Sequence, residues 1–357
     1  MAKKTKKQKE LNKLISTVAF CLFFLLLCFL YYKFSPSISN NSGDNLGSFP
    51  IVLQGEEIED LCVHFIDVGQ GDAIFIETPD KTTILIDAGD GTKDNNASLI
   101  GYLDALNVKT INYFVATHSD KDHIGGSSVI FDNYTVEFVY RPYICSKNEI
   151  SQKLTEAFNP VTPTIATSNV YANFLLNTKN EKADWAFFTQ ETDLVINYGA
   201  DGEDQLIFDF LTPTSSLNSI QYSDVNSYSP IIMLTYRGVN FMFTGDADKT
   251  VESELIDNYS ASEIDCDVLK VGHHGSDTSS TLSFLNSVSP EISIISCGNS
   301  NSYKHPKQSV INNLVGVGSL LYRTDLQGNI VASVSSTGSL KIVTEILYDG
   351  SNLYIGY

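Results

Sequence analysis

The sequence predicts an α/β domain preceded by a single transmembrane helix. Two features indicate the α/β class: short stretches rich in Val, Ile and Phe alternate with a segment of helical spacing, and polar clusters follow several of these stretches. The transmembrane helix is predicted at 14–33, which begins with 19 uncharged residues, where a span needs about 20. The hydrophobic content of 43% is typical of a globular protein with a sizeable core.

The N-terminal region predicts the topology. Residues 1–13 are basic, and the segment 34–58 is a flexible linker rich in Ser, Asn and Gly. Because lysines near a span stay in the cytoplasm, we expect a single-pass cell-membrane protein with the domain after the span outside the cytoplasm. A cleaved signal peptide is the alternative, but no small-x-small cleavage site follows the apolar stretch.

The domain at 59–357 begins with a predicted strand meander, a helix and a further strand. The polar cluster at the end of that strand lies where open α/β sheets place their chemistry. Segment 137–222 has the least readable pattern, and we interpret it as an insertion at one side of the site. A hairpin and three further strand regions are expected after it. The stretches are "LCVHFIDV", "AIFIETP", "TTILIDAG", "ASLIGYLDALNV", "INYFVATH", "PIIMLTYRGVNFMFTGDAD", "CDVLKVGHHGS", "EISIISCG" and "GNIVASVSSTGSLKIVTEILYDGSNLYIGY".

The charge distribution argues against a tight nucleic-acid-binding face. The formal net charge is −19, and the chain after residue 33 carries 16 Lys and Arg against 41 Asp and Glu. Such a domain repels polyanions at long range. An anionic substrate therefore needs a local attractor, for which a metal ion is the obvious candidate.

The stretch "THSDKDHIGG" (117–126) contains two histidines and two aspartates within six residues. Without a metal, carboxylates crowded on one turn repel each other. A divalent ion removes this cost, because ionised Asp and neutral His are the forms that bind metals. His305 lies outside this stretch. Taken alone, it is explained equally well as an ordinary surface histidine and as a residue of the site.

These motifs resemble the metallo-β-lactamase superfamily, and most of all the hydrolase domain of ComEC-type DNA-uptake proteins and their stand-alone relatives. The matching pieces, in family order from about residue 62 to 342, are "FIDVGQGDAIFI", "LIDAG", "THSDKDHIGG", "NSYSPIIML", "FTGDAD", "DVLKVGHHGS" and "NSYKHP". The resemblance implies an αββα sandwich. It also implies a site with two divalent metal ions.

The resemblance implies a role for each matching residue. His118 and Asp120 would hold one metal, Asp122 and His123 the second, and Asp246 would bridge them. The further roles are a ligand at His273, catalytic roles for Asp122, His274 and His305 (as acid, phosphate donor or extra ligand), and substrate contacts at Asn226, Ser229 and Lys304. Asp67 and Asp72 are expected to hold loops by hydrogen bonds.

Two departures from the superfamily's zinc hydrolases bear on the metal. Asp120 stands where they have histidine, and no histidine lies between His123 and His273. Oxygen ligands thus replace imidazoles, which widens the choice from Zn²⁺ to Mn²⁺. Two adjacent metals suit in-line displacement at a phosphodiester, and the resemblance implies DNA as one candidate substrate. The alternatives are hydrolysis of an amide, lactone or thioester, and a non-catalytic binding module with a vestigial site.

Overall fold

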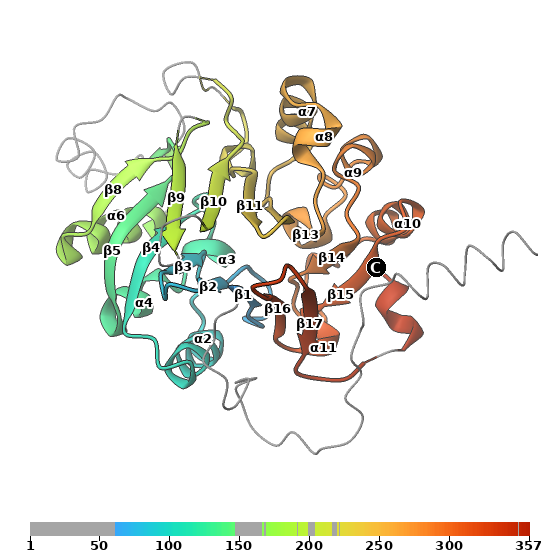
Figure 1. Cartoon of the computed structure of the whole chain (residues 1–357). Helices are drawn as coiled ribbons and strands as arrows, with labels where there is room; N and C mark the ends of the chain where they lie inside the picture. The colour runs from blue at the N-terminus through green and yellow to red at the C-terminus, as the bar shows by residue number, and fades with distance from the viewer. Residues whose placement is uncertain are drawn as a thin grey trace, which may run out of the picture. The chain divides into compact units, whose positions relative to one another are not determined.

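The protein folds into two β-sheets packed face to face, with helices over both outer faces (Figure 1). None of the helices within the described ranges has both the length and the apolar composition that a membrane crossing requires. The expected transmembrane helix at 14–33, the basic segment 1–13 and the linker 34–58 lie outside these ranges. The computed structural model describes residues 61–146, 166–167, 169–190, 192–198, 204–215, 220, 222–348 and 350–357.

The first sheet is mixed. Its pairs from β17 to β3 are antiparallel, whereas β3, β4, β5 and β8 run parallel. The parallel strands present their carboxyl ends at one edge, where polar side chains that follow them gather. The order of strands is β17 (Leu340–Thr344), β16 (Ile330–Val334), β1 (Leu61–Phe65), β2 (Ile74–Glu77), β3 (Thr83–Ile86), β4 (Thr110–Val115), β5 (Thr135–Arg141) and β8 (Asp184–Phe187).

The second sheet is divided in the same way. Its strands β12 to β15 run parallel, and β9 to β12 pair antiparallel. The order is β15 (Leu320–Arg323), β14 (Ile292–Ile295), β13 (Val268–Lys270), β12 (Val239–Phe243), β11 (Ile232–Tyr236), β10 (Asp204–Phe210) and β9 (Asp193–Tyr198). A separate pair is formed by β6 (Cys145–Ser146) and β7 (Ala166–Thr167).

The inner faces of the two sheets form one apolar core. Because successive strand residues point to opposite faces, alternate residues of each strand enter this core. Phe65 of β1 meets Phe243 of β12 across it, with ring centroids 6.3 Å apart. The other faces pack against helices, so strands such as β1 are buried along their whole length. This explains why they read as continuous apolar runs.

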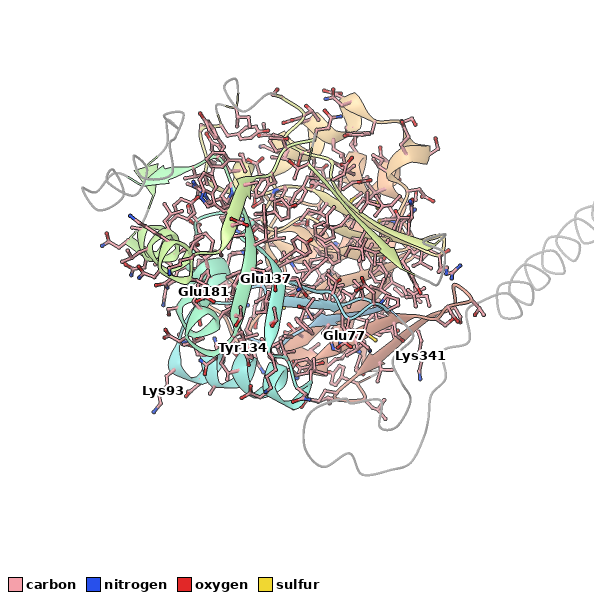
Figure 2. All side chains as sticks on the ribbon, turned by 60° about the vertical axis from the view of Figure 1, so that its left-hand side comes forward. Glu77, Lys93, Tyr134, Glu137, Glu181 and Lys341 are labelled. Carbon is pink, nitrogen blue, oxygen red and sulfur yellow. The ribbon has the colours of Figure 1, made fainter. Side chains whose placement is uncertain are left out.

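Helices cover each outer face through a separate apolar cluster. This layering confirms the expected αββα order. Exposed charged side chains such as Lys93 and Lys341 lie at the periphery (Figure 2). The first sheet packs against α2 (Lys93–Ala105), α4 (Ser127–Asn133) and α6 (Asn169–Glu181). The second packs against α7 (Lys249–Asn258), α8 (Ala261–Ile264), α9 (Leu282–Val288) and α10 (Gln308–Gly316).

Short helical turns complete the described chain. They are α3 (Lys121–Ile124), α11 (Thr324–Gln327), η2 (Asn226–Tyr228), η3 (Gly272–Gly275) and η4 (Ser351–Tyr354). Three of them, α3, η2 and η3, lie in loops that follow or precede sheet strands at the end of the sandwich where the polar clusters gather.

The described part of segment 137–222 belongs to both sheets. It includes most of β5 and the whole of β8 in the first sheet, together with β9 and β10 in the second. The sequence pattern predicts an insertion beside the site over this segment, whereas its described strands β5, β8, β9 and β10 are part of the two sheets. Their weak sequence pattern reflects their place at or next to sheet edges, where one flank of a strand carries no neighbour and fewer positions must be apolar.

Candidate metal centre

Polar side chains from both sheets meet at the carboxyl ends of their parallel strands. Asp87 follows β3, and His118 follows β4 in the first sheet. Asp246 follows β12, and His273 and His274 follow β13 in the second sheet. Each sheet therefore contributes part of the centre, and the packing of the two sheets brings the parts together.

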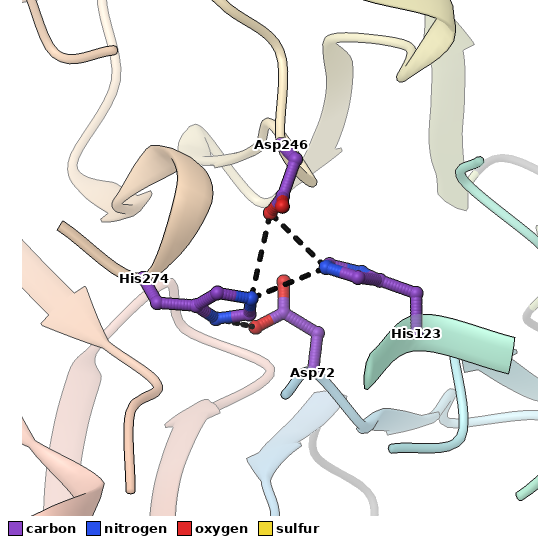
Figure 3. A group of neighbouring side chains, drawn as sticks. All are labelled: Asp72, His123, Asp246 and His274. Carbon is purple, nitrogen blue, oxygen red and sulfur yellow. Dashed lines mark hydrogen bonds and ion pairs between the residues drawn. The ribbon is translucent and has the colours of Figure 1, made fainter. Parts of the chain in front are cut away.

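Four buried side chains form the core of the centre (Figure 3). Asp72, His123, Asp246 and His274 each offer one ligand atom, and these atoms lie within 4.8 Å of one another. His123 Nε2 lies 3.1 Å from an oxygen of Asp246 and 3.2 Å from His274 Nε2. Carboxylate oxygens and imidazole nitrogens at this spacing are a donor set for a divalent transition metal.

The two oxygens of Asp246 face different groups of histidines. Oδ1 lies 3.1 Å from His123 Nε2 and 3.6 Å from His274 Nε2. Oδ2 lies 3.4 Å from His273 Nε2 and 3.8 Å from His118 Nε2. A carboxylate with a separate set of nitrogens at each oxygen has the arrangement of a bridge between two metal positions.

The one-turn helix α3 and the residue that precedes it add two carboxylates to the centre. Asp120 Oδ2 lies 3.9 Å from His118 Nε2, and Asp122 Oδ2 lies 3.5 Å from His274 Nε2. Their side chains are 44% and 26% exposed, whereas the histidines are buried. Burial and the neighbouring Asp122 raise the pKa of Asp120 to about 6. These carboxylates thus form the side of the centre that is open to solvent.

Asp87 sets the orientation of His123. Its Oδ2 lies 2.7 Å from His123 Nδ1, while Oδ1 accepts the backbone N–H of Thr117 at 2.9 Å. The Thr117 hydroxyl donates to Oδ2 at 2.7 Å. Proton donation from His123 Nδ1 to this carboxylate would leave Nε2 free to bind a metal ion, as a metal-binding histidine requires.

Ser229 and Thr117 hold His118. Its Nδ1 lies 3.1 Å from Thr117 Oγ1 and 3.2 Å from Ser229 Oγ, which also accepts the backbone N–H of Asp246 at 3.2 Å. Burial, together with the nearby His123, lowers the pKa of His118 to about 3. Neutral His118 would offer its Nε2 lone pair to a metal ion beside Asp246 when the proton is on Nδ1. Ser229, expected at the substrate, is buried and positions two members of the centre.

His274 is supported by a buried ion pair. Its Nδ1 lies 3.0 Å from the carbonyl oxygen of Ser296 and 3.3 Å from Asp72 Oδ1. Asp72 Oδ2 lies 2.8 Å from Lys270 Nζ, and both side chains are almost fully buried. Burial by itself would raise the pKa of Asp72, but Lys270 and His274 lower it to about 2. Asp72 thus acts on the imidazole of His274 from the side away from Asp246.

Three residues of the centre have left-handed backbone conformations. The φ angles of Asp87, His273 and His274 are 59°, 50° and 54°. Such conformations cost non-glycine residues about 1–3 kcal/mol each and gather at functional sites. The consecutive pair in η3 turns two neighbouring histidines toward the same carboxylate, which an extended strand cannot do because its side chains alternate.

The donor set fits divalent cations. His118 Nε2 is buried and has no hydrogen-bond partner. Burial opposes a charge on His123 and His274, yet Asp246 raises the pKa of both, that of His274 to about 9. The carboxylates of the centre thus outnumber its permanently charged cationic side chain, Lys270. The centre therefore attracts positive charge. A metal ion supplies that charge and selects neutral imidazole and ionised carboxylate.

The remaining predicted residues lie around the centre. His305, in the loop after β14, is 6% exposed, and its ring centroid lies 5.6 Å from that of His273. Its Nδ1 is buried without a hydrogen-bond partner. Asn226 begins η2 and is partly buried, and Lys304 is exposed beside His305.

Comparison with known proteins identifies the family. Residues 66–299 match the family model described as the metallo-β-lactamase superfamily. The chain belongs to this superfamily. A solved structure that is similar, the metallo-β-lactamase fold protein YhfI from Bacillus subtilis, is 12% identical with a TM-score of 0.44, and the match covers 77% of this chain and 99% of that protein.

Three curated relatives confirm the resemblance to ComEC-type proteins within the metallo-β-lactamase superfamily. ComE operon protein 3 of Bacillus subtilis is 26% identical over 90% of this chain and 36% of its own length. Competence protein ComA of Neisseria gonorrhoeae is 29% identical over 73% of this chain and 30% of its own. Recombination protein 2 of Haemophilus influenzae is 29% identical over 75% and 28%. The chain thus spans about a third of their length.

The structure brings the predicted metal residues of this metallo-β-lactamase domain around Asp246. His118, Asp120, Asp122, His123 and His273 lie next to it or next to each other, and His274, expected in a catalytic role, lies among them. The two members of the histidine pair differ in burial and in the groups that they face. His274 is the more deeply buried and faces His123, whereas the side chain of His273 is 21% exposed.

Two supporting residues, Asp87 and Lys270, are not among those predicted from the sequence. A third residue, Asp72, has a larger role in the centre than predicted. Asp87, at the end of a strand in "LIDAG", carried the same signal as Asp246 and was not selected. Lys270 is a charge within an apolar strand, which signals a buried partner. Asp72 was expected to hold loops by hydrogen bonds; it does contact His274, and belongs to the candidate metal group.

Proposed function

We propose that the chain is a metal-dependent phosphodiesterase or nuclease anchored in the cell membrane, with its domain outside the cytoplasm. The observation that carries the proposal is Asp246, whose two oxygens each face their own pair of histidines. Two adjacent divalent ions, Zn²⁺ or Mn²⁺, would supply an activated hydroxide and charge stabilisation at the entering and leaving oxygens of an in-line displacement.

The residues of the chain divide between two positions. His118, Asp120 and His273 would hold one ion with Asp246, and Asp122, His123 and His274 the other. Asp87 and Asp72 fix the imidazoles of His123 and His274 by contacts to Nδ1. Because these supports are buried, the ligand atoms are held in place before a substrate arrives.

The open side of the centre would receive the phosphate. Asp120 and Asp122 would be the partly exposed ligands, and the His305 ring lies beside that of His273. His305 would donate a proton or a hydrogen bond to a substrate oxygen, and Lys304 and Asn226 would contact the substrate. The name of one relative refers to competence and that of another to recombination, which favours DNA as the substrate.

The proposal is tested on the purified full-length chain. We expect two bound ions per chain after reconstitution with Zn²⁺ or Mn²⁺, measured by inductively coupled plasma mass spectrometry. The loaded chain is expected to hydrolyse bis-p-nitrophenyl phosphate and to lose this activity with a chelator.

Nitrocefin and a thioester serve as comparison substrates. Faster hydrolysis of either than of the phosphodiester would favour the amide, lactone or thioester alternative. Less than one ion per chain would instead favour a non-catalytic binding module.

A further inference from the structure

A row of aromatic rings leads from the buried centre to the protein surface. The ring centroid of His273 lies 6.1 Å from that of His274, and His305 lies 5.6 Å beyond His273. Tyr303 follows at 5.9 Å, with its ring plane inclined by only 26° to that of His305. Both separations to His305 are within the 4.5–7 Å typical of interacting rings. The row therefore ends in an exposed tyrosine beside His305.

Tyr303 is exposed although the ring beneath it is buried. Its exposed fraction is 60%, against 6% for His305. An exposed tyrosine needs no explanation by itself. The position of this one matters, because one face of the ring lies against a site residue while its side chain remains largely open to solvent.

The loop that carries Tyr303 is held by its own polar contacts. Asn301 brackets His305, accepting its backbone N–H at 3.0 Å and donating to its carbonyl oxygen at 2.6 Å. Asn301 also donates to the carbonyl oxygen of Gly298 at 2.8 Å, and Lys307 Nζ donates to that of Tyr303 at 2.8 Å. The ring is thus presented by an ordered loop, which lowers the entropic cost of binding against it.

The same loop is a basic segment of an acidic chain. Residues 299–307, "NSNSYKHPK", contain two lysines and no acidic residue, whereas the whole chain has 42 Asp and Glu against 23 Lys and Arg. Lys304 is exposed next to Tyr303. A cation beside an aromatic ring is the local combination with which proteins hold a nucleic-acid strand by its backbone and bases.

We propose that Tyr303 stacks against an unpaired base of a single-stranded nucleic-acid substrate while the adjacent phosphodiester occupies the centre at Asp246. This inference rests on the phosphodiesterase function proposed above. Base stacking on an aromatic side chain tolerates any sequence, because every base has a π-face. Inside a duplex both faces of a base are covered by its neighbours, so a single exposed ring selects unpaired strands. Lys304 attracts the strand locally, where the net charge of the chain repels it.

The test compares two probes that differ only in their bases. One is fluorescein-labelled, phosphorothioate-linked (dT)12, and the other is an abasic strand of the same length, linkage and charge. Binding to the metal-loaded full-length chain is measured by fluorescence anisotropy. We expect Tyr303→Ala to weaken (dT)12 binding roughly 5- to 150-fold, the range given by the loss of one base–aromatic stack. Binding of the abasic strand is expected to stay unchanged.

Two further variants separate stacking from damage to the loop. Tyr303→Phe keeps the ring and is expected to bind (dT)12 as the wild type does. Tyr354→Ala removes another exposed tyrosine, 43% exposed in η4, and is expected to change neither probe. Equal weakening of both probes by Tyr303→Ala, no effect on either, or no (dT)12 binding by the wild type would each overturn the inference.

Wild-type hydrolysis of bis-p-nitrophenyl phosphate separates the two proposals. If that hydrolysis occurs and the anisotropy results are negative, only the stacking role of Tyr303 fails. If hydrolysis is absent, the phosphodiesterase proposal fails, and the anisotropy comparison still decides whether Tyr303 stacks against bases.

Discussion

The two neighbouring histidines of η3 show how one backbone turn gives adjacent residues different surroundings. His274 lies among buried groups, with Asp72 and Ser296 at Nδ1 and with His123 and Asp246 at Nε2. His273 is partly exposed and lies next to Asp246 and His305. Replacing one or the other is therefore expected to affect different positions of the centre.

We predict that His274→Ala empties one metal position, whereas His305→Ala keeps both metals and loses turnover. Removing a ligand weakens the site itself, but removing a general acid lowers the rate by roughly 10²–10⁴ while binding persists. Metal stoichiometry and phosphodiesterase rate are measured on the same sample of each variant. Loss of a metal from His305→Ala, with both retained by His274→Ala, would reverse the two roles.

We expect a change at Asp87 to act through His123, because Asp87 contacts His123 and lies away from the ligand atoms. Asp87→Asn removes the negative charge that holds the Nδ1 proton, and metal affinity is expected to fall about 10- to 100-fold. A competition titration with a chromophoric chelator measures this affinity. Asp94→Asn, on the exposed side of α2, is the matched control. An unchanged affinity in Asp87→Asn would show that the carboxylate does not orient His123.

At the scale of elements, the centre depends on the close approach of the β1–β2 loop to α3. The backbone N–H of Asp72 donates to the carbonyl oxygen of Asp122 at 3.1 Å. Gly71 permits this contact: its φ is 148°, and a Cβ there would lie 2.3 Å from that same oxygen. The glycine is required both by the conformation and by the lack of space.

We therefore predict that Gly71→Ala destabilises the domain by about 1–3 kcal/mol and lowers metal affinity, because the loop must move away from α3. Urea unfolding and a metal titration check the two effects. Gly101→Ala is the control: Gly101 lies in α2 with nothing within 4 Å of the added Cβ. This change is expected to be neutral or to stabilise by up to about 1 kcal/mol. Equal effects of the two substitutions would contradict the steric explanation.

Glu252 connects two helices that cover the second sheet. It lies on α7, and its carboxylate accepts the backbone N–H groups of Ser280 and Thr281 at the start of α9. Burial raises its pKa from 4.5 to about 7. The unfolded chain therefore ionises at Glu252 at a lower pH than the folded chain does.

Stability contributed by this group is fully present below about pH 4.5 and is lost as the pH rises through 7. The loss is a few kcal/mol at most, because one unit of pKa shift corresponds to about 1.4 kcal/mol. We predict that Glu252→Gln flattens the decline in the free energy of unfolding between pH 5 and 8. Urea titrations of the metal-free chain at each pH measure it. A parallel decline in both proteins would assign the pH dependence to other groups.

At the scale of the whole molecule, the centre exists only where the two sheets meet. The first sheet supplies His118 and His123, and the second supplies Asp246 and His274. Neither set includes a complete position for a metal. Metal binding is consequently expected to stabilise the packing of the entire sandwich, since a ligand that binds only the folded state shifts the folding equilibrium.

The membrane topology is also a property of the whole chain. The basic segment 1–13 and the uncharged stretch after it predict a domain outside the cytoplasm. Protease added to intact cells, whose wall admits it, is expected to remove the domain and to spare a cytosolic control protein. Protection of the domain under these conditions would reverse the proposed localisation.

The sequence by itself determined the parts of the centre that lie within one turn or at the end of one strand. The spacing of His118, Asp120, Asp122 and His123 places them on a single loop, because backbone geometry over six residues is local. The apolar strands before them likewise predicted α/β layering. These features depend on short-range periodicity, which any stretch of sequence displays directly.

Only the tertiary structure decided which groups support the ligands. The pairing of Asp72 with Lys270 joins a loop of the first sheet to a strand of the second, and it determines that His274 is held from behind. The sequence pattern also did not show that β8, β9 and β10 lie at or near the sheet edges. Such pairings depend on strand order and on how the two sheets pack. The local sequence pattern is compatible with many distant partners, and only the folded structure shows which one is in contact.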